Sequence, residues 1–320
     1  MKKLLISSLL ITTGLLASCD RTSAPTIPAA TTGTVNGVRI VNDTTYQVGF
    51  TPLNNTDIVT NGKLDSATVK TISAGTATAR VCGQVQVQDT ITAAISLDST
   101  GSMDSNDPTA LRRDAAKRFI TRMSSQDRAA VLSFDGGTRP NANLGVSYLW
   151  QDFTSDKTLL NTGVDNATFA GGGTPLYGAI VDGSTIVKAS GGTNGSLLIL
   201  TDGEDNAYVN QYQQAIDTAR ANGTKVYAIG LDAQNNLDFS ALEDIAATTG
   251  GLFQKANDAA ALDGFFDRMY NAFRAQGCVE LVFTQKPAAG TEVTGTLNIV
   301  ISAADRKPAT VEVPFAFTVR

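Results

Sequence analysis

The chain has 320 residues, of which 42% are hydrophobic and 17% charged. This length predicts about two domains, and the apolar content suffices for a full core, which excludes a disordered chain. The sequence contains no histidine, so nucleophiles activated by histidine and metal centres ligated by histidine are excluded. The formal net charge of -5 argues against nucleic acid as a partner, because phosphate backbones are bound by basic surfaces.

The N-terminal segment has the organisation of an export signal. Two lysines precede an apolar run at residues 4–17 that is too short to span a bilayer. The run ends in Leu16-Ala17-Ser18-Cys19, which resembles the lipobox of bacterial lipoproteins. The resemblance implies a signal peptide over residues 1–18, lipidation of Cys19, and export to the bacterial cell envelope with a lipid anchor in a membrane. The alternative is an ordinary cleaved signal with an incidental cysteine.

The segment after Cys19 has no regular pattern. Residues 19–32 are rich in Thr, Ala and Pro and show no periodicity, so we expect a flexible tether.

In an oxidising compartment, Cys82 and Cys278 are available for pairing. We expect them to form a disulfide, because each lies just outside one end of the central region. The alternative is two unrelated buried thiols.

Both flanks of the central region carry strand patterns. Residues 33–88 include the alternating Tyr46, Val48 and Phe50, and residues 278–320 include a clean alternation from Val311 to Val319. Neither flank has helical periodicity. We therefore expect the two flanks to pack together as one antiparallel, sandwich-like domain built from both ends of the chain.

The centre, residues 89–277, has a different pattern. Helical segments alternate with short apolar runs that lack alternation and predict buried parallel strands, at residues 93–97, 129–134, 197–200 and 226–229. One helix has an apolar stripe from Leu111 to Met123, for which Asp107 and Pro108 are the expected N-cap and first-turn proline; the others cover 211–222 and 259–275. This alternation predicts an α/β domain with a doubly wound, mostly parallel sheet, in which ligands bind beyond the carboxyl ends of the strands.

Polar motifs follow these strand ends. The first strand runs into Asp98-Ser99-Thr100-Gly101-Ser102, the run 197–200 leads to Thr201-Asp202-Gly203, and three glycines precede Thr174-Pro175 at a helix start. In order and spacing, the three segments resemble the von Willebrand factor A family and its metal-ion-dependent adhesion site. That site combines Asp-x-Ser-x-Ser after the first strand, a Thr from a middle loop, and an Asp after the fourth strand.

The resemblance covers residues 89–277 and implies a ligand set for one metal ion: Asp98, Thr100, Ser102, Thr174 and Asp202. Thr100 stands where serine is usual, and it keeps the hydroxyl. Carboxylates and hydroxyls are hard donors that suit Mg²⁺, with Mn²⁺ or Ca²⁺ as alternatives. Taken singly, the residues also have structural explanations: Thr174 as a helix N-cap, Asp98 and Ser102 as side chains that bond their own turn, and Asp202-Gly203 as an ordinary turn.

Two classes of function are compatible with this pattern. The first is a lipid-anchored, metal-dependent protein-binding module for adhesion or envelope assembly, in which the ion binds an Asp or Glu of a protein partner. The second is a metal-assisted hydrolase of the cell envelope. We favour the first and expect no enzyme, because no motif places a general base beside the site. A structural protein with an unused site is a further alternative.

Overall fold

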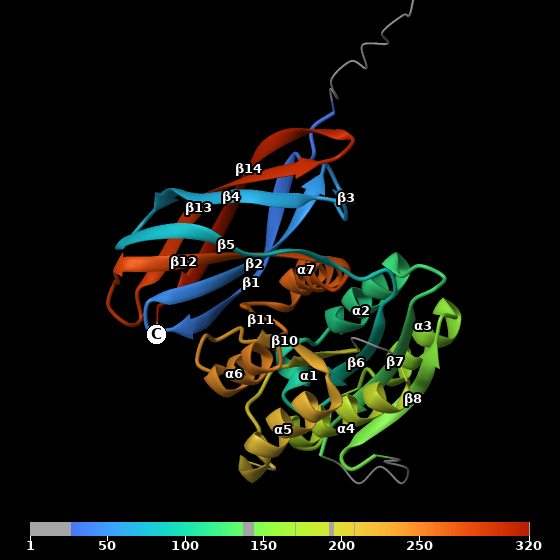
Figure 1. The fold of residues 1–320 in the computed structure, drawn as a ribbon. Coiled ribbons are helices and arrows are strands. Elements are labelled where there is room, and N and C mark those ends of the chain that lie inside the picture. Colours follow the sequence, from blue (N-terminus) through green and yellow to red (C-terminus); the bar gives the residue numbers. More distant parts are fainter. Residues whose placement is uncertain (1–26, 137–143, 170, 192–194, 208, 320) are drawn as a thin grey trace, which may run out of the picture.

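The computed structural model describes residues 27–136, 144–169, 171–191, 195–207 and 209–319. The predicted signal peptide, the lipidation site Cys19 and residues 20–26 of the predicted tether lie outside these ranges. The chain forms an α/β part and an antiparallel β-sandwich, with helix α7 (Leu262–Arg274) beside their junction (Figure 1). Within the described ranges, no helix combines the length and the apolar character needed to cross a bilayer.

The α/β part is built on a six-stranded sheet of order β11-β10-β9-β6-β7-β8. Five strands are parallel, and the edge strand β8 (Ser147–Thr154) is antiparallel to its neighbour. The parallel strands are β6 (Thr92–Asp98), β7 (Arg128–Phe134), β9 (Ser196–Thr201), β10 (Lys225–Leu231) and β11 (Phe253–Ala256). The first four confirm the strands predicted from the apolar runs.

Helices cover both faces of this sheet. One face packs against α2 (Leu111–Arg122), α3 (Lys157–Asn166) and α7, and the other against α4 (Leu176–Ala189), α5 (Tyr212–Asn222) and α6 (Ser240–Thr248). A short helix, α1 (Met103–Asn106), follows β6, and single 3₁₀ turns precede α5 and α7. Both sheet faces are therefore buried, which is why these strands read as continuous apolar runs. The predicted doubly wound α/β fold is confirmed.

The sandwich combines strands from both ends of the chain, as predicted. One sheet has the order β1-β2-β12-β5, with β3 beside β2, and the other has the order β14-β13-β4. The first holds β1 (Thr32–Asn42), β2 (Thr45–Asn54), β3 (Asp57–Ile58), β5 (Thr76–Val87) and β12 (Ala275–Gln285). The second holds β4 (Lys63–Ile72), β13 (Glu292–Ala303) and β14 (Arg306–Thr318). In Figure 1 the blue N-terminal and red C-terminal strands lie side by side.

The structure corrects two sequence boundaries of the sandwich. The predicted tether over residues 19–32 does not reach Thr32, because Ala29 and Ala30 are only 1% exposed and pack into the sandwich core. The predicted boundary at residue 277 is also too late, since β12 begins at Ala275 directly after α7. Ala29 and Ala30 lie outside any alternating run, whereas the buried positions of β12 alternate from Ala275 to Phe283.

Helix α2 begins later than predicted. Ala110 adopts a left-handed conformation with φ of 56°, so the helix starts at Leu111 and Pro108 lies before it. Asp107 nevertheless caps the first turn from a distance, because its carboxylate accepts hydrogen bonds from the backbone N–H groups of Leu111 (2.7 Å) and Arg112 (3.1 Å). The carboxylate also pairs with the guanidinium of Arg112 at 2.7 Å.

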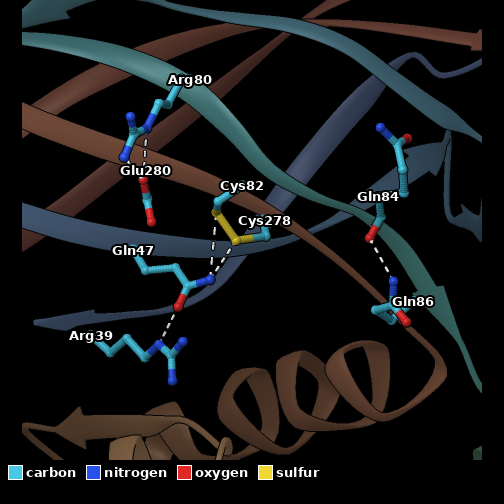
Figure 2. The surroundings of a disulfide bond; sticks show 8 residues. All are labelled: Arg39, Gln47, Arg80, Cys82, Gln84, Gln86, Cys278 and Glu280. Atoms are coloured by element: carbon cyan, nitrogen blue, oxygen red, sulfur yellow. Dashed lines mark hydrogen bonds and ion pairs between the residues drawn. A yellow bond between two sulfur atoms is a disulfide. The ribbon is translucent and has the colours of Figure 1, made fainter. Parts of the chain in front are cut away.

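The predicted disulfide between Cys82 and Cys278 is present. It joins β5 to β12, two neighbouring antiparallel strands, and its Cα atoms are 5.2 Å apart (Figure 2). The bond closes a loop with a sequence separation of 196 residues that contains the whole α/β part. By the chain-entropy relation, such a loop is worth about 5 kcal/mol of unfolding free energy.

Candidate functional site

The candidate site lies at the carboxyl edge of the parallel sheet. Asp98 is the last residue of β6, and Asp202 directly follows β9, the strand paired with β6. Parallel neighbours present their carboxyl ends at the same edge, so the two loops meet there. Asp98 and Asp202 are 0% and 2% exposed, so two carboxylates are buried at one place.

Asp98 is held by its own turn and by the neighbouring strand. One oxygen, Oδ1, accepts a hydrogen bond from the backbone N–H of Thr100 at 2.8 Å. The other, Oδ2, accepts from the Thr201 hydroxyl at 2.7 Å. The Thr201 Oγ1 also lies 3.0 Å from the carbonyl oxygen of Gly203 and accepts from its N–H at 3.1 Å. The turn after β9 is thereby tied to the end of β6.

Asp202 faces the first loop. Its Oδ1 accepts from the Ser102 hydroxyl at 2.7 Å, and its Oδ2 accepts from the Asn106 side-chain amide at 3.0 Å. The Ser102 Oγ lies 3.1 Å from the Thr100 Oγ1. Hydrogen bonds therefore link Thr100, Ser102 and Asp202 side chain to side chain, and the structural explanation that Ser102 bonds only its own turn does not hold.

Thr174 comes from the middle loop and is 3% exposed. Its backbone N–H donates to the Asn206 side-chain oxygen at 2.8 Å, and a Cβ built on Gly203 would lie 3.3 Å from its Oγ1. The loop is held against the first one, because the N–H of Gly101 donates to the carbonyl of Gly172 at 3.2 Å. Helix α4 begins after Pro175 without a side-chain cap, so Thr174 is not its N-cap.

Ionisation of Asp98 is made costly by its surroundings. Burial, reinforced by the negative charge of Asp202, raises the pKa of Asp98 to about 6, although hydrogen bonds from Thr100 and Thr201 lower it. These hydroxyl and amide donors are neutral, and they leave a net negative charge in a desolvated place. An arrangement of this kind favours a cation.

The donor set fits a small hard cation. It consists of carboxylate and hydroxyl oxygens, which suit Mg²⁺, Mn²⁺ or Ca²⁺, and two carboxylates would balance the charge of a divalent ion. Within the described ranges, no group of three or more His, Cys, Asp or Glu side chains is placed to hold a metal. Any metal held here therefore depends on the hydroxyls of Thr100, Ser102 and Thr174 as well as on the two carboxylates.

Sequence reasoning missed three residues that organise the site. Thr201 holds the Asp98 carboxylate, Asn106 holds Asp202, and Asn206 holds the backbone of Thr174. Two of them carried a signal. Thr201 precedes Asp202, and Asn106 lies four residues after Ser102, a spacing that brings side chains together on one helical turn.

The sequence and the fold of this chain resemble known proteins. The family model described as von Willebrand factor type A domain matches residues 94–268. A solved structure described as von Willebrand factor type A from Catenulispora acidiphila has a TM-score of 0.51 at 12% identity, covering 92% of this chain and 75% of that one. A search of curated proteins gives no match.

Two further solved structures are similar over part of their length. Proximal thread matrix protein 1 from the mussel byssus has a TM-score of 0.47 at 19% identity, covering 61% of this chain and 48% of that one. The pilus adhesin SpaC from Lactobacillus rhamnosus GG has a TM-score of 0.47 at 10% identity, covering 87% of this chain and 47% of that one. The chain thus spans about half the length of these two proteins.

Proposed function

Because the chain belongs to the von Willebrand factor type A domain family, we propose that it is a protein-binding module that grips an acidic side chain of its partner through a divalent cation. The ligands would be Asp98, Thr100, Ser102, Thr174 and Asp202, with Mg²⁺ as the expected ion. The observation that carries the proposal is the juxtaposition of two buried carboxylates, Asp98 and Asp202, with the hydroxyls of Ser102 and Thr201 at one sheet edge.

The chain's own residues would shape the site before any partner arrives. Thr201 and the Thr100 N–H orient the Asp98 carboxylate, and Asn106 orients Asp202. A bound Mg²⁺ would supply a positive centre with a coordination position open to a carboxylate oxygen. Neutral hydroxyl ligands neutralise little of that charge, so a partner's Asp or Glu would be attracted in a partly desolvated contact.

We further propose that the module is exported and attached to a bacterial envelope membrane through lipid on Cys19. The support is the lipobox-like segment Leu16-Ala17-Ser18-Cys19 after a short apolar run. Residues 20–26 and the segment from Ile27 would then connect the anchor to the sandwich, whose first strand begins at Thr32. The α/β part would be presented away from the anchor by the sandwich.

We propose binding, and no catalysis, as the role of the site. In this proposal Asp98 and Asp202 are ligands of the cation, and no sequence motif places a further general base beside them. A general base needs an accepting oxygen within reach of the water or hydroxyl that it deprotonates.

The test is metal-dependent capture of partner protein from envelope extracts. The full chain, immobilised, is expected to retain a partner in Mg²⁺ and release it in EDTA. Ser102→Ala should lose this retention, because it removes a proposed ligand hydroxyl, whereas Asp217→Asn, an exposed change on α5, should keep it. Amidation of the partner's carboxylates before mixing should abolish retention. Retention that is equal in EDTA, or that survives amidation, contradicts the proposal.

A further inference from the structure

A second site lies at the opposite edge of the parallel sheet. A cavity of about 290 Å³ opens where the sandwich meets the amino ends of β10 and β11. Its walls come from the β1–β2 pair, from β5 and β12 with the Cys82–Cys278 disulfide, from Lys225 at the start of β10, and from the glycine turn before β11. The candidate metal ligands lie at the carboxyl ends of the same sheet's strands, so the two sites are separate.

The lining of this cavity is cationic in an acidic protein. Two of the residues that line it, Arg39 and Lys225, carry positive charge, and its described lining contains no carboxylate, whereas the whole chain has a net charge of -5. In the described part of the chain, Lys225 makes no side-chain hydrogen bond or ion pair. Burial alone lowers the pKa of Lys225. An anion bound beside Lys225 would stabilise the charged form of this partly buried ammonium group.

The guanidinium of Arg39 is already oriented. Its Nε donates to the Gln47 side-chain oxygen, and one terminal nitrogen donates to the carbonyl of Ala247 at 3.2 Å. The Gln47 amide in turn contacts the disulfide sulfurs, as Figure 2 shows. Arginine has five N–H donors in a planar fork. Two contacts hold Arg39 in place and leave donors for a ligand.

Two glutamine amides add neutral hydrogen-bonding capacity. Gln88 and Gln276 line the cavity, and their side-chain amides make no hydrogen bond within the ranges that the structure covers. Each amide offers both donors and acceptors, which is the requirement for binding hydroxyl groups. The cavity thus combines two cations for an anionic group with two amides for hydroxyls.

The walls are preformed. The disulfide joins β5 to β12 beside Gln47. On the other side, a Cβ on Gly251 would collide with the carbonyl oxygen of Val226, so the turn before β11 packs directly on the backbone of β10. Rigid walls reduce the ordering cost of binding. The volume lies just below the usual range of ligand pockets, about 300–1,000 Å³.

We propose that this cavity binds an acidic monosaccharide or a small hydroxy acid of the same chemistry, with one carboxylate and several hydroxyls. Arg39 and Lys225 would bind the carboxylate, and Gln88 and Gln276 would bind the hydroxyls. The size of the cavity accommodates a single ring. This site needs no metal, so it stands independently of the function proposed above.

Calorimetric titration of the full chain with D-glucuronate tests the proposal. We expect saturable binding of one glucuronate, and at least tenfold weaker binding of D-glucose, which lacks the carboxylate, and of acetate, which lacks the hydroxyls. Absence of glucuronate binding overturns the proposal. Equal binding of glucose or of acetate overturns the assigned chemistry.

Variants locate the binding in the cavity. Lys225→Gln should weaken glucuronate binding about tenfold, the scale of a lost charged hydrogen bond, whereas Lys188→Gln, on the exposed end of α4, should bind as the wild type does. In Gly49→Ala, the new Cβ would lie 2.6 Å from the Gln276 amide nitrogen, the mobile end of a side chain. This change should displace the amide and weaken binding with an unchanged melting temperature. Equal affinities for Lys225→Gln and Lys188→Gln, or unaltered binding by Gly49→Ala, contradict the assignment.

Discussion

The effect of Asp98→Asn on the stability of the protein is expected to have opposite signs with and without a divalent cation. Without divalent cations, Asp98→Asn should stabilise the protein at neutral pH, because it removes a buried negative charge next to Asp202. With Mg²⁺, the wild type should gain stability that the variant cannot gain, because the variant lacks a proposed ligand. Few mechanisms other than cation binding predict such a reversal.

The magnitude follows from the pKa of Asp98. Burial and Asp202 raise it from 3.8 to about 6 in the folded protein. The folded state therefore binds more protons than the unfolded state between these two values, and the unfolding free energy falls as the pH rises through this window. By neutral pH the loss amounts to about 3 kcal/mol. The asparagine side chain of the Asp98→Asn variant does not ionise, so the variant avoids this loss.

The site can satisfy the amide oxygen and one of the two amide N–H groups. The amide oxygen can keep the hydrogen bond from the Thr100 N–H. The amide nitrogen can donate to the Thr201 hydroxyl, which can direct its own hydrogen to the carbonyl of Gly203 at 3.0 Å. At neutral pH the variant is therefore expected to recover a large part of the unfolding free energy, about 3 kcal/mol, that the wild type loses when Asp98 ionises.

Urea denaturation followed by tryptophan fluorescence measures this effect. The sole tryptophan, Trp150, lies in β8 and reports on the α/β part. In EDTA, the variant should exceed the wild type at pH 8, and the difference should shrink towards pH 4. Excess Mg²⁺ should add about 2.7 kcal/mol to the wild type at a hundredfold of its dissociation constant and nothing to the variant. Asp217→Asn should match the wild type throughout. Equal Mg²⁺ shifts in the wild type and in Asp98→Asn, or a variant less stable than the wild type in EDTA at pH 8, would refute the reasoning.

Three further predictions concern the disulfide, the anchor and catalysis. Cys278→Ser should lower the unfolding free energy by about 5 kcal/mol in urea titrations, because the unfolded chain loses a crosslink with a sequence separation of 196 residues and gains conformational entropy. A change below about 1 kcal/mol would contradict this prediction. Cys19→Ser should move the protein expressed in bacteria from the detergent phase to the aqueous phase, whereas Cys82→Ser should leave it in the detergent phase; identical partitioning of all three forms would rule out the lipid. With Mg²⁺, the purified chain should not hydrolyse a chromogenic phosphoester, and turnover that Asp98→Ala abolishes would favour the hydrolase.

The α/β part is largely readable from sequence, because its signals are local. The apolar runs at 93–97 and 197–200 are strands buried on both faces, and such strands need no alternation. Helices α3 and α6 were missed, since their buried positions are few; in α3 they are Leu160, Gly163 and Val164. The Asp156 carboxylate accepts hydrogen bonds from the backbone N–H groups of Thr158 and Leu159. This N-cap residue was the signal in the sequence that could have predicted the start of α3.

The sequence does not predict the features of the fold that depend on contacts between distant segments. The alternation in both flanks predicts a sandwich, but nothing local specifies that β12 enters between β2 and β5, or that β13 lies between β14 and β4. The burial of Ala29 and Ala30 has the same origin. At the site, the motifs identify Asp98, Ser102 and Asp202, whereas the hydrogen bonds among them and the cavity around Lys225 arise only when distant strands are brought together.

The most direct test of the central claim is anomalous diffraction from crystals of the protein soaked in manganese chloride. The account predicts one strong anomalous peak at the carboxyl edge of the sheet, within coordination distance of oxygens from Ser102, Thr174 and one of the two aspartates directly or through water. The peak should vanish in Asp202→Asn crystals. Water alone at this place, or manganese bound only elsewhere, would contradict the account.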